Sequence, residues 1–247
     1  MHRQLREFHY KEAHFHIHTE VWDEVCSRII ADRQNLESFI RESPDFKTSL
    51  VPLALEVSED LLPESVRRMQ NASRLTGLGP MAAVAGTMAQ LAAEQSKKAG
   101  SYQTIVENGG DIFLDCREEV VLGLYPGRNS PFANLALRIS SDSMPLAVCT
   151  SSGRMGHSLS FGDCDIVTVF SKDASLADAA ATLGCNSIQK EEDIEPVLNH
   201  LISIKGIQGA LVLRDDRFGA AGSIPELIRT GDPDLMNKVS RDRKSNF

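Results

Sequence analysis

The sequence predicts an α+β protein, in which helices and strands occupy separate stretches of the chain. Strand-like segments cluster between residues 104 and 170, and helical patterns dominate both flanks. The strict β-α-β alternation of a doubly wound parallel sheet is missing. Hydrophobic residues make up 42% of the 247 residues and charged residues 24%, a balance typical of globular chains with a buried core.

The N-terminal segment predicts a strand or hairpin over residues 5–18. Its alternation puts His14, His16 and His18 on one face and apolar side chains on the other. A solvated face is the favoured interpretation of these histidines. A metal site is the alternative, although no carboxylate completes an obvious ligand set.

Helices follow in the first half of the chain. Apolar residues recur at helical spacing after Trp22, and Pro63 and Pro80 each suit the first turn of a helix. Pro52 argues against a central strand in the apolar segment 50–57. Helices are expected over 21–41, 63–73 and 80–95.

The second half begins with strands and then alternates less regularly. Helices are expected over 174–184 and 192–203, and a Gly-rich stretch lies at 219–222. Strands are expected near 104–107, 111–115, 120–125, 133–139, 146–150, 165–170 and 207–213.

Charge and cysteine usage narrow the class of partner. The formal net charge is -8, which disfavours nucleic acid, and the basic cluster Arg241, Arg243 and Lys244 is interpreted as a solvated tail. Five scattered cysteines without a C-x-x-C pair indicate free thiols in a reducing, cytoplasmic compartment. The N-terminus does not read as a signal peptide, and no apolar run is long enough to span a membrane.

The first polar motif is ENGGDIFL. Asn108, Gly109 and Gly110 predict a tight turn, and Asp111 follows at the head of a strand. A capped turn is the structural interpretation. The functional one is a backbone surface that a ligand approaches, with these four residues and Glu107 as contacts.

The second motif is the polar segment CTSSGRMGHSLSFGDCD between two apolar strands. Its hydroxyls and glycines suit an anion-binding nest, and His157 titrates near neutral pH, so that it is the candidate general acid or base. A serine-hydrolase triad is not supported, because no G-x-S-x-G elbow is present. The candidate ligand contacts here are Thr150, Ser151, Ser152, Gly153 and Ser158.

The third motif is SLADAAATLGCN. Asp178 and Thr182 are four residues apart and therefore share one helix face, where their oxygens suit Mg²⁺. Taken alone, the pattern favours a structural interpretation, with an acid near the helix N-terminus and a threonine bonded to the preceding turn. The amides that follow Gly79, at the start of the first Ala-rich helix, are further candidates for binding an anion.

These motifs carry a family resemblance. GGDI, a T-S-x-G segment, an apolar strand and A-D-A-x-A-T, in that order, resemble ApbE, the transferase that moves FMN from FAD to proteins. The stretches GLGPMAAVAG, ENGGDIFL, CTSSGRMGHSLSFGDCDIVTVFS and LADAAATLGCN, with FHYKEAHFHIH, more closely resemble an uncharacterised family of cytoplasmic ApbE-related proteins.

The resemblance implies one ApbE-like domain over residues 1–247. Two similar α/β halves, about 1–115 and 116–247, would surround a mainly antiparallel sheet. It also implies that Asp178 and Thr182 hold Mg²⁺ against a flavin nucleotide, FAD or FMN, with the turn at Gly109 lining the same pocket. Asp178 and His157 are then the candidate catalytic residues.

Two departures separate this chain from ApbE. The His-x-x-Asp-Pro-x-Thr-Gly stretch is replaced, since His157 is followed by SLSFG. The Lys-Gly-x-x-x-Asp segment is replaced by GLGPMAAVAG. The expected function is therefore Mg²⁺-dependent group transfer on a flavin nucleotide or another phosphorylated small molecule. A protein that binds a different anionic metabolite on the same fold, and a structural subunit of a homo-oligomer, are the alternatives.

Overall fold

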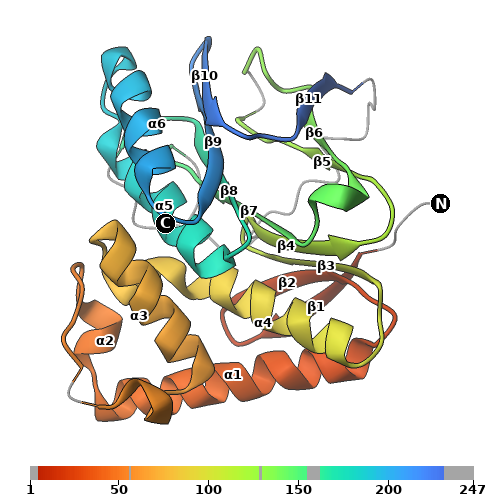
Figure 1. Ribbon diagram of the computed structural model, residues 1–247, viewed down its shortest axis with the longest axis vertical. Helices are drawn as coiled ribbons and strands as arrows, with labels where there is room; N and C mark the ends of the chain where they lie inside the picture. Colours follow the sequence, from red (N-terminus) through yellow and green to blue (C-terminus); the bar gives the residue numbers. More distant parts are fainter. Residues whose placement is uncertain (1–4, 56, 128–129, 155–161, 231–247) are drawn as a thin grey trace.

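A computed structural model describes residues 5–55, 57–127, 130–154 and 162–230 of the chain. Its strands form two antiparallel sheets, one of eight strands and one of three. The large sheet has the order β1-β2-β3-β4-β7-β8-β9-β10, and the small sheet has the order β11-β6-β5. Helices α1, α3, α4, α5 and α6 lie together on one side of the large sheet (Figure 1). The α+β prediction with a mainly antiparallel sheet is confirmed.

The helices match the sequence prediction closely, with additional short turns. Helix α2 and the short 3-10 segments η1 to η4 connect the longer elements. The helical elements are α1 Trp22–Glu42, α2 Asp45–Thr48, η1 Glu59–Leu61, α3 Glu64–Thr76, η2 Pro80–Ala83, α4 Val84–Lys98, η3 Ser141–Ser143, α5 Ala174–Ser187, η4 Glu191–Asp193 and α6 Ile194–Ser203.

The strands include two that the sequence did not predict. Strand β10 falls on the Gly-rich stretch and β11 follows it; glycine weakens the strand pattern that a sequence reading depends on. The strands are β1 Arg6–Tyr10, β2 Ala13–His18, β3 Gln103–Asn108, β4 Asp111–Cys116, β5 Val120–Gly123, β6 Leu135–Ile139, β7 Leu146–Ser151, β8 Ile166–Ser171, β9 Ile207–Arg214, β10 Arg217–Gly222 and β11 Glu226–Arg229.

Each face of the large sheet buries its own apolar cluster. On β4, Phe113 belongs to the cluster beneath the helices, whereas Ile112 and Leu114 belong to the cluster beneath the small sheet. Because side chains alternate along a strand, Asp111 shares the helix-facing side with Phe113. Its cross-strand partner Cys149 also belongs to the helix-side cluster.

Helices α4 and α5 pack directly on one another beside the sheet (Figure 1). A Cβ added to Gly86 on α4 would overlap the Ala174 carbonyl oxygen and lie 2.9 Å from the Asp178 Cβ on α5. The absence of a side chain at Gly86 therefore permits this close approach. The small side chains of the two Ala-rich segments are what bring Asp178 to the first turn of α4.

The hairpin at the N-terminus has the predicted faces. Phe15 and Ile17 are fully buried, and the histidines at 14, 16 and 18 are half-buried on the other side. His16 lies 3.9 Å from Glu107 and 3.8 Å from Glu7. The described residues contain no group of three or more His, Cys, Asp or Glu side chains that could hold a metal ion.

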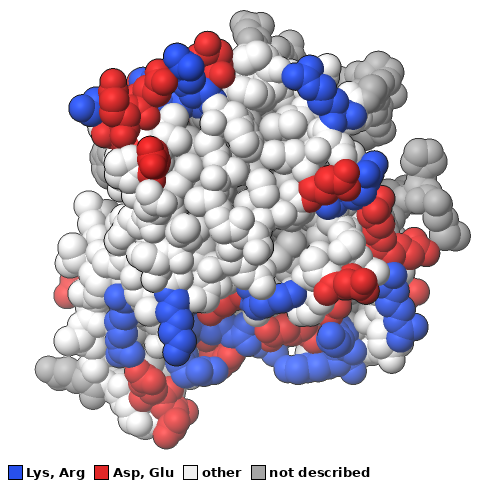
Figure 2. All heavy atoms as spheres, turned by 45° about the horizontal axis from the view of Figure 1, so that its top comes forward, with Lys and Arg blue, Asp and Glu red and all other residues white. Residues whose placement is uncertain are grey.

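The charged side chains on the face shown in Figure 2 lie mostly at its margins. Acidic and basic groups are interspersed there, and the middle of this face is largely uncharged. The net charge of -8 therefore does not appear on this face as a field of one sign.

Among the helices that the structure describes, none has the length and apolarity required to cross a membrane.

Candidate functional site

The candidate site lies where the first turn of α4 meets α5 and the β3–β4 hairpin. The Gly86 amide donates to Asp178 Oδ2 over 2.9 Å. The Asn108 side-chain amide donates to the Ala85 carbonyl over 3.2 Å. The start of α4 is thus bonded to α5 on one side and to the sheet on the other.

The β3–β4 hairpin turns as its glycines predict. Gly109 and Gly110 have φ values of 64° and 101°, the left-handed region that glycine tolerates best. This two-residue turn pairs Asn108 with Asp111 across the hairpin. Both side chains are buried, at 9% and 7% exposure. The turn therefore places an amide and a carboxyl next to α4.

Asp111 is held by the neighbouring strand. The Cys149 thiol and the Thr150 backbone amide both hydrogen-bond its carboxyl group. The Cys149 Sγ also lies 3.6 Å from the Ala174 carbonyl on α5. The other carboxyl oxygen, Oδ1, is buried and has no hydrogen-bond partner among the described residues. Four other buried side-chain atoms among the described residues also lack a partner, but Asp111 Oδ1 is the one carboxyl oxygen among these five, and such a group calls for an explanation such as a bound ion.

The two buried carboxyl groups affect one another. Burial raises the pKa of Asp178 to about 7, against the lowering effect of the Gly86 and Ala85 amides. Burial and then the nearby Asp178 raise the pKa of Asp111 well above its ordinary value. Within the described part of the chain, neither group has a lysine or arginine among its hydrogen-bond or ion-pair partners. The pair therefore carries an electrostatic cost that a cation would offset.

The donor set suits a hard divalent cation. Mg²⁺ is usually bound by one or two carboxylates together with water and substrate phosphates. Asp178 supplies a carboxylate, and a carboxylate can accept more bonds than the amides of Gly86 and Ala85 provide. Thr182 lies one helical turn further along α5 and is half-buried. These two residues and the unsatisfied oxygen of Asp111 are compatible with a metal at this place.

Asp178 is not in the first turn of α5, contrary to the structural interpretation of the sequence. Asp173, not Asp178, caps α5: its Oδ1 accepts from the amides of Ser175 at 2.9 Å and Leu176 at 3.2 Å. Asp178 lies in the second turn of α5, and its carboxyl group accepts from the Gly86 amide in the first turn of α4. The anion expected near the N-terminus of α4 is therefore, in this structure, a side chain of the protein itself.

A polar seam joins α4 and α5 beyond Gly86. Thr87 Oγ1 donates to Ser175 Oγ over 2.7 Å. Gln90 Oε1 accepts from the Ala174 amide over 2.7 Å. These pairs and the role of Cys149 cannot be predicted from the sequence, because spacing along the chain gives no sign of the register between the two helices and the two strands.

The polar segment after β7 is only partly joined to this group. The Gly153 amide donates to the Cys164 carbonyl over 3.2 Å, so it is not the free amide that an anion nest requires. Thr150 Oγ1 lies 2.9 Å from Thr168 Oγ1, on the face opposite Cys149. Only its backbone amide reaches Asp111.

The remaining predicted contacts are distributed as follows. Ser151 is buried on the Cys149 side of β7, and the Ser152 hydroxyl accepts from the Arg154 amide over 3.2 Å. Gly79 is buried, and a Cβ there would overlap the Ser49 carbonyl. His157 and Ser158 lie outside the described residues, so that their roles remain predictions.

Ion pairs fix the chain on both sides of this segment. Arg154 contacts Asp163 at 2.8 Å, Asp165 at 3.0 Å and Asp215 at 2.6 Å. Arg214 adds a contact to Asp163 at 2.9 Å. These ion pairs anchor the ends of the polar segment to the β9–β10 turn, and the Asp163 amide also donates to the Ile188 carbonyl at the C-cap of α5 over 2.7 Å.

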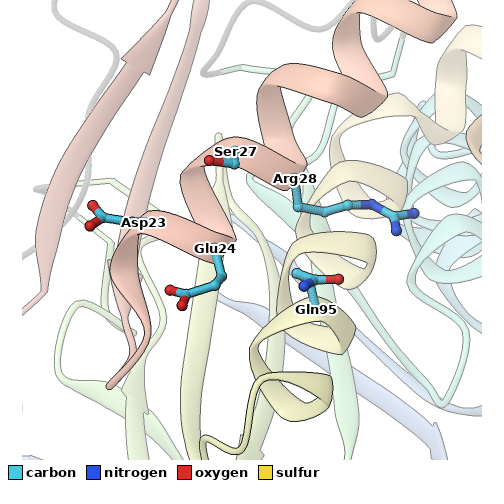
Figure 3. A pocket seen from close by; sticks show the side chains of 5 residues that line it. All are labelled: Asp23, Glu24, Ser27, Arg28 and Gln95. Atoms are coloured by element: carbon cyan, nitrogen blue, oxygen red, sulfur yellow. The ribbon is translucent and has the colours of Figure 1, made fainter.

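A surface groove of about 500 Å³ lies elsewhere, between α1 and α4. Figure 3 shows Glu24 and Arg28 on α1 opposite Gln95 on α4. Gln95 is nine residues from Gly86, about 13 Å along the helix axis. This groove is thus separate from the carboxylate pair, and its mixed, exposed lining gives no indication of a ligand.

Comparison with known proteins identifies the family. A family model described as "AbpE bacteria" matches residues 2–200. The chain belongs to this family. It is 40% identical to a UPF0280 protein of Methanocaldococcus jannaschii over 82% of each chain. It is 43% identical to a UPF0280 protein of Methanosarcina acetivorans, over 80% of this chain and 77% of the relative.

Solved structures of ApbE proteins share the fold of this family member. A variant of the flavin transferase ApbE from Vibrio cholerae superimposes with a TM-score of 0.56 at 14% identity, over 90% of this chain and 98% of the other. The ApbE protein of Thermotoga maritima gives 0.52 at 14% identity, over 92% and 97%. The predicted ApbE-related family is confirmed, and at these identities the structures establish the fold alone.

Proposed function

We propose that this protein binds a phosphorylated small molecule, with a flavin nucleotide as the first candidate. Mg²⁺ held by Asp178 and Thr182 would assist a group transfer on that molecule. The observation that carries the proposal is the buried Asp178–Asp111 pair, which has no basic partner among the described residues. Membership of an ApbE-related family and the matching A-D-A-x-A-T positions add support.

The chain's own groups would divide the work between holding and orienting the ligand. The Asn108 amide fixes the start of α4 against the hairpin, and the Gly86 amide orients Asp178. A bound Mg²⁺ would neutralise phosphate charge and polarise the phosphorus towards attack. The proposal thus assigns electrostatics and positioning to this site, which are the main requirements of phosphoryl chemistry.

With FAD as the donor, the FMN half of the molecule would be transferred to an acceptor hydroxyl. A hydroxyl oxygen of an acceptor forms a bond to the phosphorus of the FMN half. The bond from that phosphorus to the bridging oxygen breaks, and AMP leaves. The hydroxyl proton passes to a general base, for which His157 is the candidate.

A second candidate function is binding of a non-flavin anionic metabolite at the same place. The observation that favours it is the loss of the two ApbE segments, His-x-x-Asp-Pro-x-Thr-Gly and Lys-Gly-x-x-x-Asp. The engaged Gly153 amide and the opposite orientation of Thr150 point the same way, because they remove expected contacts to a nucleotide.

Calorimetric titration with FAD and FMN, with and without MgCl₂, tests the proposal. We expect binding that requires Mg²⁺ and is lost in Asp178→Asn. Asp173→Asn is the matched control, since this acid lies on the same helix but caps its own N-terminus. Flavin binding that does not depend on Mg²⁺ would refute the role of the metal, and no binding of FAD or FMN under either condition would favour the second candidate. Equal binding by the wild type and Asp178→Asn would refute the assignment of Asp178.

A further inference from the structure

We propose that Asp111 is a third protein ligand of the cation, reaching it from the sheet while Asp178 and Thr182 reach it from α5. This inference rests on the proposed function and deepens it, because it adds a binding residue from a second element. The sequence motif by itself assigned Asp111 only as a contact to the organic ligand.

The fold places the Asp111 side chain on the same side of the sheet as α5. Asp111 is the first residue of β4 and follows a turn whose glycines adopt left-handed conformations. Pairing with Cys149 fixes its side chain on the helix-facing side of the sheet. The Cys149 thiol lies 3.6 Å from the Ala174 carbonyl, one turn before Asp178. The two carboxyl groups therefore approach the same place from the sheet and from α5.

One carboxyl oxygen of Asp111 is buried without a hydrogen-bond partner among the described residues. Asp111 is 7% exposed, and its Oδ1 has no hydrogen-bond partner in the described part of the structure. Its carboxyl group already accepts from a thiol and a backbone amide. A buried oxygen left without a donor is costly, so folds retain such groups mainly where a ligand, water or ion completes them.

Other acids on the helix side of the molecule have basic partners. Asp115, four residues further along β4, is paired with Lys97 at 2.8 Å. Asp32 on α1 is buried and is paired with Arg28. Asp111 is instead next to the like-charged Asp178, and no lysine or arginine is among its described partners. Asp115 and Asp32 are therefore neutralised by basic side chains, whereas the Asp111–Asp178 pair is compatible with a bound cation as its partner.

The charge count also favours two carboxylates. A site of one carboxylate and one hydroxyl binds a divalent cation weakly, because affinity increases with the number of charged ligands. With Asp111 included, the protein ligands offset the full charge of the ion before any phosphate binds. The proposal therefore predicts that metal binding is measurable in the absence of a nucleotide.

Manganese titration followed by electron paramagnetic resonance tests this directly, with MnCl₂ alone as the probe at pH 8. We expect Asp111→Asn and Asp178→Asn each to weaken Mn²⁺ binding by at least about tenfold. Asp115→Asn, on the same strand, should leave the affinity at the wild-type value. MgCl₂ should displace the bound Mn²⁺ from the wild type.

The outcomes separate the two proposals. Weakened binding in Asp178→Asn with wild-type affinity in Asp111→Asn would overturn the role of Asp111 and leave the proposed function intact. Wild-type affinity in Asp178→Asn, or no binding in the wild type, would overturn the metal site itself. Circular dichroism checks that each variant folds. If Asp111→Asn does not fold, the smaller and still polar Asp111→Ser takes its place.

Discussion

Gly86→Ala is expected to separate the two helices that form the candidate site. The new Cβ would overlap the Ala174 carbonyl oxygen and would lie 2.9 Å from the Asp178 Cβ, where ordinary contact begins at 3.4 Å. Ala174 is the first residue of α5, and its carbonyl is held in place by the helical backbone, so that it cannot rotate away. The helices must therefore separate by at least about 0.5 Å, which would also strain the Gly86–Asp178 hydrogen bond.

The magnitude follows from two opposing contributions. Overpacking of a tight interior costs about 1–3 kcal/mol, and a backbone clash belongs at the upper end. Replacing glycine by alanine in a helix recovers about 1 kcal/mol. We expect a net loss of about 2 kcal/mol in the free energy of unfolding. For a chain of this size that lowers Tm by about 4–8 °C.

Gly184→Ala is the matched control for this comparison. Gly184 is also buried and helical, but its Cβ would meet the Leu201 Cδ1 at 2.9 Å and the Val167 Cγ1 at 3.0 Å. Methyl groups at the ends of side chains can shift, so the helix gain should offset most of the cost. Thermal unfolding by circular dichroism measures both variants. A Tm for Gly86→Ala at or above the wild-type value, or equal losses in the two variants, would refute the close-approach argument.

Two further predictions concern titratable groups. Because burial raises the pKa of Asp178 to about 7, folding favours its neutral form; stability in metal-free buffer should therefore fall as pH rises from about 4 to about 7, by up to about 1.4 kcal/mol per pH unit. Asp178→Asn should remove this pH dependence, although the neighbouring Asp111 and Cys149 also face the group. In denaturant unfolding the variant should be more stable than the wild type at pH 8 and nearly equal to it at pH 4. A variant no more stable than the wild type at pH 8 would contradict the raised pKa of Asp178. The sulfur atoms of Cys164 and Cys185 are buried 3.2 Å apart, and diamide should therefore join them in a disulfide that peptide mass mapping detects, whereas modification of other cysteines first would argue against this proximity.

The sequence was sufficient for the elements whose patterns are local. Periodicity located the long helices, and the alternation at the N-terminus gave the correct buried and polar faces, with Phe15 and Ile17 inside. The strands of the Gly-rich C-terminal region were missed. Four of the six residues of strand β10 are glycine or alanine, so that its sequence shows no apolar alternation.

The candidate site was predictable in its composition but not in its contacts. The motifs named Asp111 and Asp178, which are neighbouring buried carboxyl groups in the structure, and the glycine turn has the backbone conformation that its residues require. The direction of Asp178 towards Gly86 depends on how α4 crosses α5. That crossing is set by packing between segments far apart in the chain, which spacing within one motif cannot encode.

The polar seam between α4 and α5 has a consequence for synthesis of the chain. Gly86 and Asp178 are 92 residues apart, and Thr87 and Ser175 are 88 residues apart. At ribosomal rates of roughly 5–20 residues per second, the partner helix emerges about 5–18 s after α4. Until then the face of α4 that packs on α5 lacks this partner on the nascent chain. Chaperones that bind exposed apolar helices would therefore find, on the nascent chain, the surface that later carries the candidate site.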